Sequence, residues 1–158
     1  MIRIGFGFDT HKLEPGYDFW LGGVLVPHDK GAVGHSDADV LIHAIIDALL
    51  GAAGLRDIGN QFPDNDPSFK AIDSKILLER TMRLIGERNF EIGNIDSTIV
   101  LQSPKILNFV PAMVQTLAEV MQISQNQISV KAKTSEKLGF IGREEGVSAY
   151  AVVLLHKS

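Results

Sequence analysis

The segment from Asp37 to Ala53 limits the possible folds most, because it is apolar on almost every side. Positions 40–42, 44–46 and 48–50 carry only Val, Leu, Ile or Ala. A helix that is hydrophobic all round must be buried by the rest of the protein. Ser36 precedes the segment as a suitable N-cap, and Gly54 follows it where a helix can end. We therefore expect a fold in which this helix is buried.

A narrow polar stripe interrupts the apolar surface of this helix. Asp39, His43 and Asp47 are spaced four residues apart, so they lie above one another on one face. An unpartnered buried polar group costs about 1–3 kcal/mol, so the stripe needs partners or a ligand. Asp9 and His11 can supply them, since residues i and i+2 of an extended segment point the same way. Two imidazoles and a carboxylate with one position open are typical of a catalytic zinc site.

A second interpretation of the stripe needs no metal. His43 would then be a core histidine bonded to Asp39 or Asp47, and Asp9 would cap a turn. Spacing alone does not separate the two interpretations. The chain contains no cysteine, so any metal must be held by imidazole and carboxylate groups.

The order of the remaining segments predicts an α+β fold. In residues 2–9, large apolar side chains at even positions alternate with small or charged ones, which is the period of a strand. The other expected elements are a short hairpin within 19–27, a loop at 56–67, helices at 71–89 and 106–121, strands at 91–103, 127–134 and 147–156, and a glycine-bearing turn at 139–142. This order favours a two-layer sandwich in which helices pack on one face of a mainly mixed sheet, with residues 1–158 as a single domain.

Composition excludes several classes of partner. The formal net charge of -4 supplies no basic field for nucleic acid or an anionic membrane surface. The longest apolar stretch, residues 40–55, is too short and too polar to span a bilayer. A strand pattern begins at the first residues, so we expect no targeting peptide and a cytoplasmic location. Neither a phosphate-binding GxxxxGK[ST] loop nor a dinucleotide fingerprint is present.

Four further segments are candidates for binding a ligand. His35 and Ser36 precede a predicted helix, where free backbone N–H groups favour a phosphate, although Ser36 can equally be a plain cap. Acidic residues in 57–66 can bind the hydroxyls of a sugar alcohol, or can simply be solvated turn residues. The segments 102–105 and 132–136 lie at predicted strand ends, where they are free to contact a ligand or to serve as ordinary connections. The apolar turn at 139–143 suggests a protected interface.

Five segments in the same order resemble the family of 2-C-methyl-D-erythritol 2,4-cyclodiphosphate synthases. The resemblance extends from Arg3 to about Leu155. The matching segments are residues 3–11 (RIGFGFDTH), 34–40 (GHSDADV, leading to His43), 57–59 (DIG), 62–64 (FPD) and 134–140 (TSEKLGF). Five ordered matches are more specific than any single motif.

This resemblance implies a role for each candidate residue. Zn²⁺ would be bound by Asp9, His11 and His43, and Mg²⁺ or Mn²⁺ by Glu136 together with the substrate diphosphate. Phosphate groups would be held by His35 and Thr134, which are the expected catalytic residues. The resemblance places the erythritol part of the substrate near Asp57 and Asp64. The further expected substrate contacts are Ser36, Ile58, Gly59, Phe62 and Asp66. It places the cytidine near Leu101, Pro104, Lys105, Ile106, Leu107, Ala132 and Lys133.

The resemblance also implies a reaction and an assembly. The substrate would be 4-diphosphocytidyl-2-C-methyl-D-erythritol 2-phosphate, whose 2-phosphate attacks the β-phosphorus and expels CMP. The assembly would be a homotrimer with active sites between subunits, and Phe140 and Arg143 would contact an isoprenoid in its central cavity. Lys133 replaces a common threonine, and Glu144 replaces a common glycine. A zinc-dependent phosphohydrolase and a non-catalytic nucleotide- or isoprenoid-binding protein remain alternatives.

Overall fold

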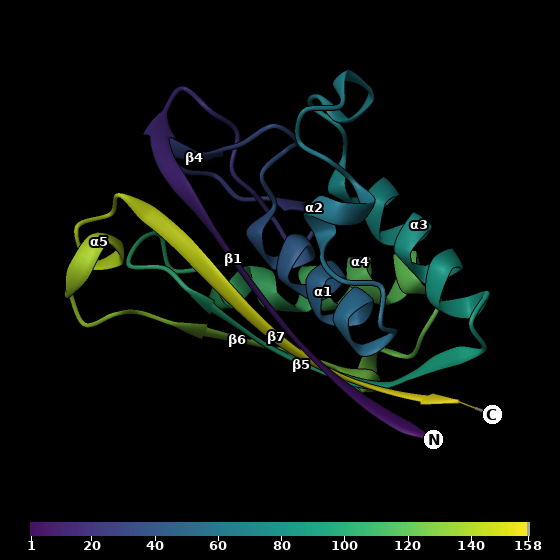
Figure 1. The fold of residues 1–158 in the computed structure, drawn as a ribbon. Helices are drawn as coiled ribbons and strands as arrows, with labels where there is room; N and C mark the ends of the chain where they lie inside the picture. The colour runs from purple at the N-terminus through teal and green to yellow at the C-terminus, as the bar shows by residue number, and fades with distance from the viewer. Residues whose placement is uncertain (158) are drawn as a thin grey trace.

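A five-stranded sheet carries the longer helices on one face in the computed structural model, which describes residues 1–157 (Figure 1). Ser158, the last residue of the expected domain, lies outside this range. The strand order is β4-β1-β7-β5-β6, and only β5 and β6 are parallel. The strands are β1 (Ile2–Pro15), β4 (Lys30–Val33), β5 (Phe90–Val100), β6 (Ile128–Lys133) and β7 (Gly146–Lys157). The predicted α+β fold with a mixed sheet is confirmed.

The helices and the hairpin follow the sequence-based expectations with shifted ends. The hairpin consists of β2 (Trp20–Leu21) and β3 (Val24–Leu25). The helices are α1 (Val40–Ala52), α2 (Ile58–Gln61), α3 (Ser74–Gly86), α4 (Val110–Met121) and α5 (Gly139–Gly142), with 3-10 turns η1 (Pro67–Phe69), η2 (Leu107–Phe109) and η3 (Gln125–Gln127). The expected loop at 56–67 contains α2, the expected turn at 139–142 is α5, and β4 was not predicted. No helix within residues 1–157 combines the length and hydrophobicity needed to cross a membrane.

Helix α1 is buried, as its sequence predicts, and it packs on β1, β7 and α3. The prediction that Ser36 is its N-cap is wrong. The helix begins at Val40, because Ala38 has a φ of 58° and Asp39 takes the capping position. The Asp39 carboxylate accepts N–H groups from Ile42 at 3.0 Å, Gly22 at 2.9 Å and Gly23 at 2.7 Å. Asp39 therefore joins the start of α1 to the hairpin.

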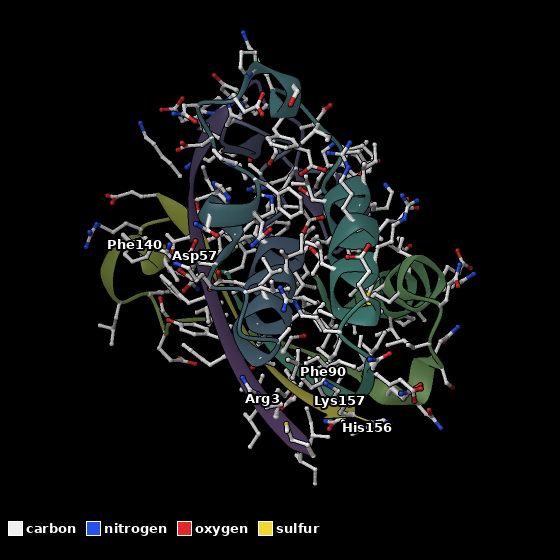
Figure 2. The ribbon with its side chains drawn as sticks, turned by 45° about the vertical axis from the view of Figure 1, so that its right-hand side comes forward. Arg3, Asp57, Phe90, Phe140, His156 and Lys157 are labelled. Carbon is white, nitrogen blue, oxygen red and sulfur yellow. The ribbon has the colours of Figure 1, made fainter. Side chains whose placement is uncertain are left out.

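Strand β1 turns its glycines, rather than its large side chains, toward α1. A Cβ atom added at Gly7 would lie 1.9 Å from the carbonyl oxygen of Ala44, and one at Gly5 would lie 1.9 Å from that of Ala48. The helix therefore rests directly on the backbone of the strand. Arg3 strengthens this contact at the other end of α1, where its Nε donates to the carbonyl of Ala52 at 2.9 Å (Figure 2).

The large apolar side chains of β1 lie on the opposite face of the sheet and are exposed. Ile4 and Phe6 are 72% and 62% exposed. In the neighbouring β7, the exposed Val152 lies opposite Phe6 and the exposed Tyr150 lies opposite Phe8. We call this surface the outer sheet face; it comprises Ile2, Ile4, Phe6, Phe8, Tyr150 and Val152. An exposed apolar surface of this kind marks an interaction site.

Gly7→Ala is expected to destabilise the protein by about 3 kcal/mol or more, because the added methyl group collides with the backbone of α1. Gly51→Ala, in α1 itself, is the matched control, since nothing lies within 4 Å of the added Cβ. That control should stabilise the helix by about 0.5–1 kcal/mol. Thermal unfolding of both variants checks the close contact, and equal midpoints would contradict it.

Candidate metal and nucleotide-binding site

Three side chains from β1 and α1 meet at one point. Asp9 and His11 share a face of β1, and His43 reaches them from α1. Asp9 Oδ2 lies 2.8 Å from His11 Nε2 and 3.0 Å from His43 Nδ1, and the two nitrogens are 3.2 Å apart. We call these three residues the triad. The predicted meeting of Asp9, His11 and His43 is confirmed.

The dimensions of the triad fit a divalent metal ion. An ion about 2.0–2.2 Å from each atom of a tetrahedral set holds those atoms roughly 3.3–3.6 Å apart. The observed separations of 2.8–3.2 Å are slightly shorter, so small outward movements would admit an ion. Within residues 1–157, the triad is the only group of three or more acidic or imidazole side chains with ligand atoms this close.

Hydrogen bonds to the outer nitrogens turn both imidazoles toward the centre of the triad. His11 Nδ1 lies 3.0 Å from the carbonyl oxygen of Val33, which can only accept. The Nδ1–H of His11 therefore donates outward, and the lone pair of Nε2 points inward. His43 Nε2 lies 2.8 Å from Ser74 Oγ and 3.1 Å from Ser36 Oγ, which leaves Nδ1 facing Asp9. Outer partners of this kind are typical of metal-binding histidines.

The charges within the triad favour a carboxylate ligand. Burial would raise the pKa of Asp9, but hydrogen bonding and charge interaction with the His11 and His43 rings in their protonated forms outweigh it and lower that pKa to about 2. Burial would lower the pKa of His11, yet its hydrogen bond and charge interaction with Asp9 raise it. Asp9 is therefore ionised at neutral pH, and a metal ion binding here displaces any proton held by His11.

The triad opens into a pocket of about 430 Å³. The other lining residues come from the loop before α1, from α2 and its flanks, and from the region around α3: Gly34, His35, Ser36, Ile58, Gly59, Phe62, Asp64, Phe69 and Leu77. Six candidate ligand contacts therefore surround the triad, namely His35, Ser36, Ile58, Gly59, Phe62 and Asp64.

Two other acidic candidates have capping roles near this pocket but do not line it. Asp57 Oδ1 accepts the N–H of Asn60 at 2.8 Å and caps α2. Asp66 Oδ1 accepts the N–H of Ser68 at 2.9 Å and caps η1. The backbone carbonyl of Asp66 also lies 3.1 Å from His35 Nε2. These contacts hold the acidic loop beside the pocket, and binding of substrate hydroxyls by Asp57 and Asp66 stays a prediction.

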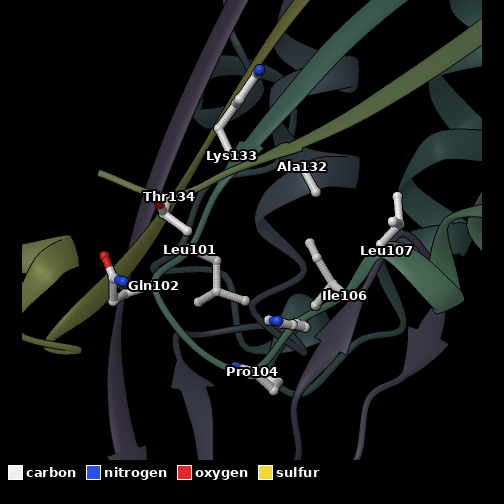
Figure 3. A pocket seen from close by; sticks show the side chains of 9 residues that line it. Leu101, Gln102, Pro104, Ile106, Leu107, Ala132, Lys133 and Thr134 are labelled. Carbon is white, nitrogen blue, oxygen red and sulfur yellow. The ribbon is translucent and has the colours of Figure 1, made fainter. Parts of the chain in front are cut away.

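A second pocket, of about 200 Å³, lies where the parallel strands β5 and β6 end (Figure 3). Its lining contains all seven residues expected near a cytidine, together with Gln102 and Thr134: Leu101, Gln102, Pro104, Lys105, Ile106, Leu107, Ala132, Lys133 and Thr134. The two segments gather because parallel strands end at the same edge of the sheet. No residue lines both this pocket and the triad pocket.

Glu136, Phe140 and Arg143 do not line the triad pocket within one chain, although Phe140 lies beside His11. Glu136 is exposed, has a φ of 55°, and donates its N–H to Thr134 Oγ1 at 3.2 Å. Phe140, in α5, lines a shallow hollow with His11 and Thr10 of β1. Arg143 Nε donates to Glu145 at 2.9 Å. The structure of one chain therefore does not bring Glu136 to the triad.

Comparison with known proteins agrees with this geometry over the whole chain. The sequence model of the YgbB family matches residues 2–156. The chain belongs to the YgbB family. A relative from Bacteroides fragilis, named 2-C-methyl-D-erythritol 2,4-cyclodiphosphate synthase, is 60% identical over 156 residues, which cover 99% of this chain and 98% of the relative. A relative of the same name from Porphyromonas gingivalis is 62% identical over 154 residues, covering 98% and 95%.

Solved structures related to this YgbB-family chain share its fold. One, described as the CDP complex of IspF from Plasmodium falciparum, has a TM-score of 0.87 and 39% identity, covering 99% of this chain and 97% of that one. Another, a 2C-methyl-D-erythritol-2,4-cyclodiphosphate synthase in a CDP-bound form, has a TM-score of 0.90 and 41% identity, covering 98% and 100%.

Several partners of the triad were missed in the sequence. The interpretation of His43 as a core histidine bonded to Asp39 or Asp47 is wrong, because Asp39 caps α1 and Asp47 accepts the N–H of Ile58 at 3.1 Å. The outer partner of His43, Ser74, lies 31 positions away at the start of α3, where a serine is common for reasons unrelated to metal binding. No spacing rule links such distant positions.

His43→Ala is expected to weaken binding of Zn²⁺ or Co²⁺ by more than about 100-fold, because a direct ligand is lost rather than an outer partner. Competition with a coloured chelator measures this affinity. His156→Ala is the control, since that imidazole is only half-buried and pairs with Glu91 at the far end of β7. Unchanged metal affinity in a folded His43→Ala protein would rule out the triad as a metal site.

Proposed function

We propose that this YgbB-family chain converts 4-diphosphocytidyl-2-C-methyl-D-erythritol 2-phosphate to 2-C-methyl-D-erythritol 2,4-cyclodiphosphate and CMP, a step in non-mevalonate isoprenoid precursor biosynthesis. The observation that carries the proposal is the match, at about 60% identity over the full length, to relatives named as this synthase. The triad and the two pockets supply the chemical groups that the reaction needs.

The reaction is an internal phosphoryl transfer that requires no nucleophile from the protein. An oxygen of the 2-phosphate forms a bond to the β-phosphorus, and the bond from that phosphorus to the oxygen shared with the α-phosphate breaks. CMP leaves with the electron pair. The protein must fold the substrate back on itself and neutralise the charge that builds up on the diphosphate.

The triad is the proposed Zn²⁺ site, since two imidazoles and a carboxylate with one open position suit zinc. A zinc ion held there supplies a positive charge beside the diphosphate. Asp9, His11 and His43 hold their lone pairs toward this point, and Glu136 is the proposed ligand of Mg²⁺ or Mn²⁺ bound with the diphosphate. His35 lines the triad pocket, so it is placed to hold a phosphate group; the same task is proposed for Thr134 in the second pocket.

The two pockets divide the substrate between them in this proposal. The erythritol part lies against 57–66, where backbone and carboxylate oxygens can accept its hydroxyl protons. The cytidine occupies the pocket at 101–107 and 132–134, whose apolar floor and free backbone groups suit the face and edge of a base. The CDP complexes of related structures support a nucleotide in this fold.

A homotrimer with active sites between subunits would bring the triad pocket of one chain to the nucleotide pocket of another. The triad lies on β1 while Thr134 follows β6, and the sheet order places β7 and β5 between these strands. The triad pocket and the nucleotide pocket also share no lining residue. A second copy that brings its nucleotide pocket to the triad of the first would complete the site, and the outer sheet face supplies an apolar surface for such assembly.

The assembled outer sheet faces would enclose an apolar centre. An isoprenoid is the proposed occupant, with Phe140 and Arg143 as its contacts. Glu144 has a φ of 59°, a conformation in which glycine is unstrained, so its side chain adds charge at this end of the sheet without a backbone advantage. A cytoplasmic location, expected from the sequence, stays a prediction.

Incubation of the purified protein with the cytidine substrate, Zn²⁺ and Mg²⁺ should release CMP together with a cyclic diphosphate. Phosphorus NMR separates the cyclic product from the linear diphosphate that a phosphohydrolase would form. His43→Ala should lose the activity and His156→Ala should keep it. CMP accompanied by the linear product would replace the synthase proposal with hydrolysis, and unchanged substrate would indicate a binding protein.

Mixed trimers should test whether one site is built from two chains. His43→Ala and an inactivating Thr134 substitution are each expected to be inactive alone. Refolding them together in equal amounts makes mixed trimers about three quarters of the total, each with one intact site in three, so roughly a quarter of sites recover. CMP release measures the recovery after sizing of the refolded proteins. A mixture no more active than either parent would show that each chain supplies its whole site.

A further inference from the structure

We infer that Ser74 and Asp37 are positioning residues that hold His43 in the tautomer whose Nδ1 is free to bind the metal. The inference rests on the proposed metal site but not on the reaction catalysed there. Ser74 is the first residue of α3 and is fully buried. Its Oγ lies 2.8 Å from His43 Nε2 and is also hydrogen-bonded to Asp37 Oδ1. The three side chains form a continuous chain that ends at the triad.

The direction of each hydrogen bond in this chain follows from the protons available. An ionised carboxylate has no proton to donate, so Asp37 must accept from the Ser74 hydroxyl. A hydroxyl has one proton, so Ser74 can meet His43 only as an acceptor. His43 Nε2 must then carry the ring proton, and Nδ1 keeps its lone pair. That lone pair faces Asp9 Oδ2 at 3.0 Å and His11 Nε2 at 3.2 Å, where the metal would lie.

Ser36 cannot fix the tautomer in the same way. Its Oγ also lies near His43 Nε2, at the longer distance of 3.1 Å, and it accepts the N–H of Ala38 at 3.2 Å. No carboxylate takes up its hydroxyl proton in the described residues, so Ser36 can act toward His43 as either donor or acceptor. The carboxylate of Asp37 is what gives Ser74 a single role.

Asp37 also ties the loop before α1 to the start of α3 through backbone groups. Its Oδ2 accepts the N–H of Ser74 at 2.9 Å, its Oδ1 accepts the N–H of Asp39 at 3.1 Å, and its own N–H donates to Ile72 at 3.1 Å. Each of these three bonds uses a backbone group and survives Ser74→Ala. This variant therefore interrupts the path to His43 while leaving the loop connection in place.

Ser74→Ala should bind zinc about 10- to 100-fold more weakly than the wild type, the range found when an outer partner of a metal ligand is lost. Chelator competition on the intact protein measures the affinity, and thermal unfolding reports the fold. Ser74→Thr keeps the hydroxyl and should recover most of the affinity. Thr81→Val removes another buried hydroxyl of α3, one that donates only to the carbonyl of Leu77, and should leave zinc affinity unchanged.

Asp37→Asn tests the carboxylate itself, since an amide N–H can donate to Ser74 Oγ. The Ser74 hydroxyl is then free to donate to His43 Nε2, which reverses the direction of both hydrogen bonds. This variant too should weaken zinc binding. Wild-type zinc affinity in folded Ser74→Ala, or in folded Asp37→Asn, would overturn the inference.

The tautomer can also be observed without any variant. Nitrogen-15 NMR of the imidazoles in the wild-type protein, in alkaline buffer with and without zinc, should show the proton of His43 on Nε2 in both forms. A proton on Nδ1 in the zinc-free protein would overturn the inference. Neither the zinc affinity nor the NMR measurement depends on turnover. A wild-type protein that meets both expectations but forms no cyclic product would therefore refute the proposed reaction and leave this inference standing.

Discussion

The direct contact between α1 and the backbone of β1 is the constraint on which the rest of the structure depends. Gly5 and Gly7 allow the helix to approach so closely that Cβ atoms at these positions would overlap its carbonyl oxygens. This approach brings His43 within hydrogen-bond distance of Asp9. With larger residues in β1, the helix would stand further away and the triad would not close. The packing of two elements therefore sets the dimensions of the metal site.

The three polar residues of the α1 stripe have three different kinds of hydrogen-bond partner. Asp39 accepts N–H groups from the hairpin and from the helix start, His43 joins the triad, and Asp47 accepts the N–H of Ile58 at the start of α2. The polar face of one buried helix thus contributes a ligand to the metal site and hydrogen-bonds both the hairpin and the segment that lines the pocket. Each polar group is paired, which is what burial in an apolar helix requires.

Much of the fold and of the triad could be predicted because local patterns determine them. The spacing of Asp39, His43 and Asp47 on an apolar helix identified the buried face, and the alternation in residues 2–9 identified the strand that carries Asp9 and His11. The side of that strand which meets α1 was not predictable from hydrophobicity, since the large side chains face outward. Gly5 and Gly7 are explained only by the close approach of the α1 backbone, which depends on how the chain folds and not on local sequence.

The unpredicted parts of the site depend on contacts between distant segments. Ser36 reads as a helix cap by sequence, but the left-handed backbone at Ala38 delays the helix and Asp39 takes its place. The Val33 carbonyl that orients His11 belongs to β4, a four-residue strand without a clear alternating pattern. Ser74 meets His43 only because α3 packs beside α1. Hydrogen-bond partners of this kind become visible once the chain is folded.

The pairing of the first strand with the last also determines when the triad can form. Ile2 lies opposite His156 and Lys12 opposite Gly146, so the two termini lie side by side (Figure 1). Residues 9, 11 and 43 lie close together in the sequence, but the strand that carries the first two gains its long neighbour only when residues 146–157 have been made. Closing so large a loop is entropically slow and gives the fold a high contact order. Metal capture by the triad should therefore follow the pairing of residues 2–12 with residues 146–156.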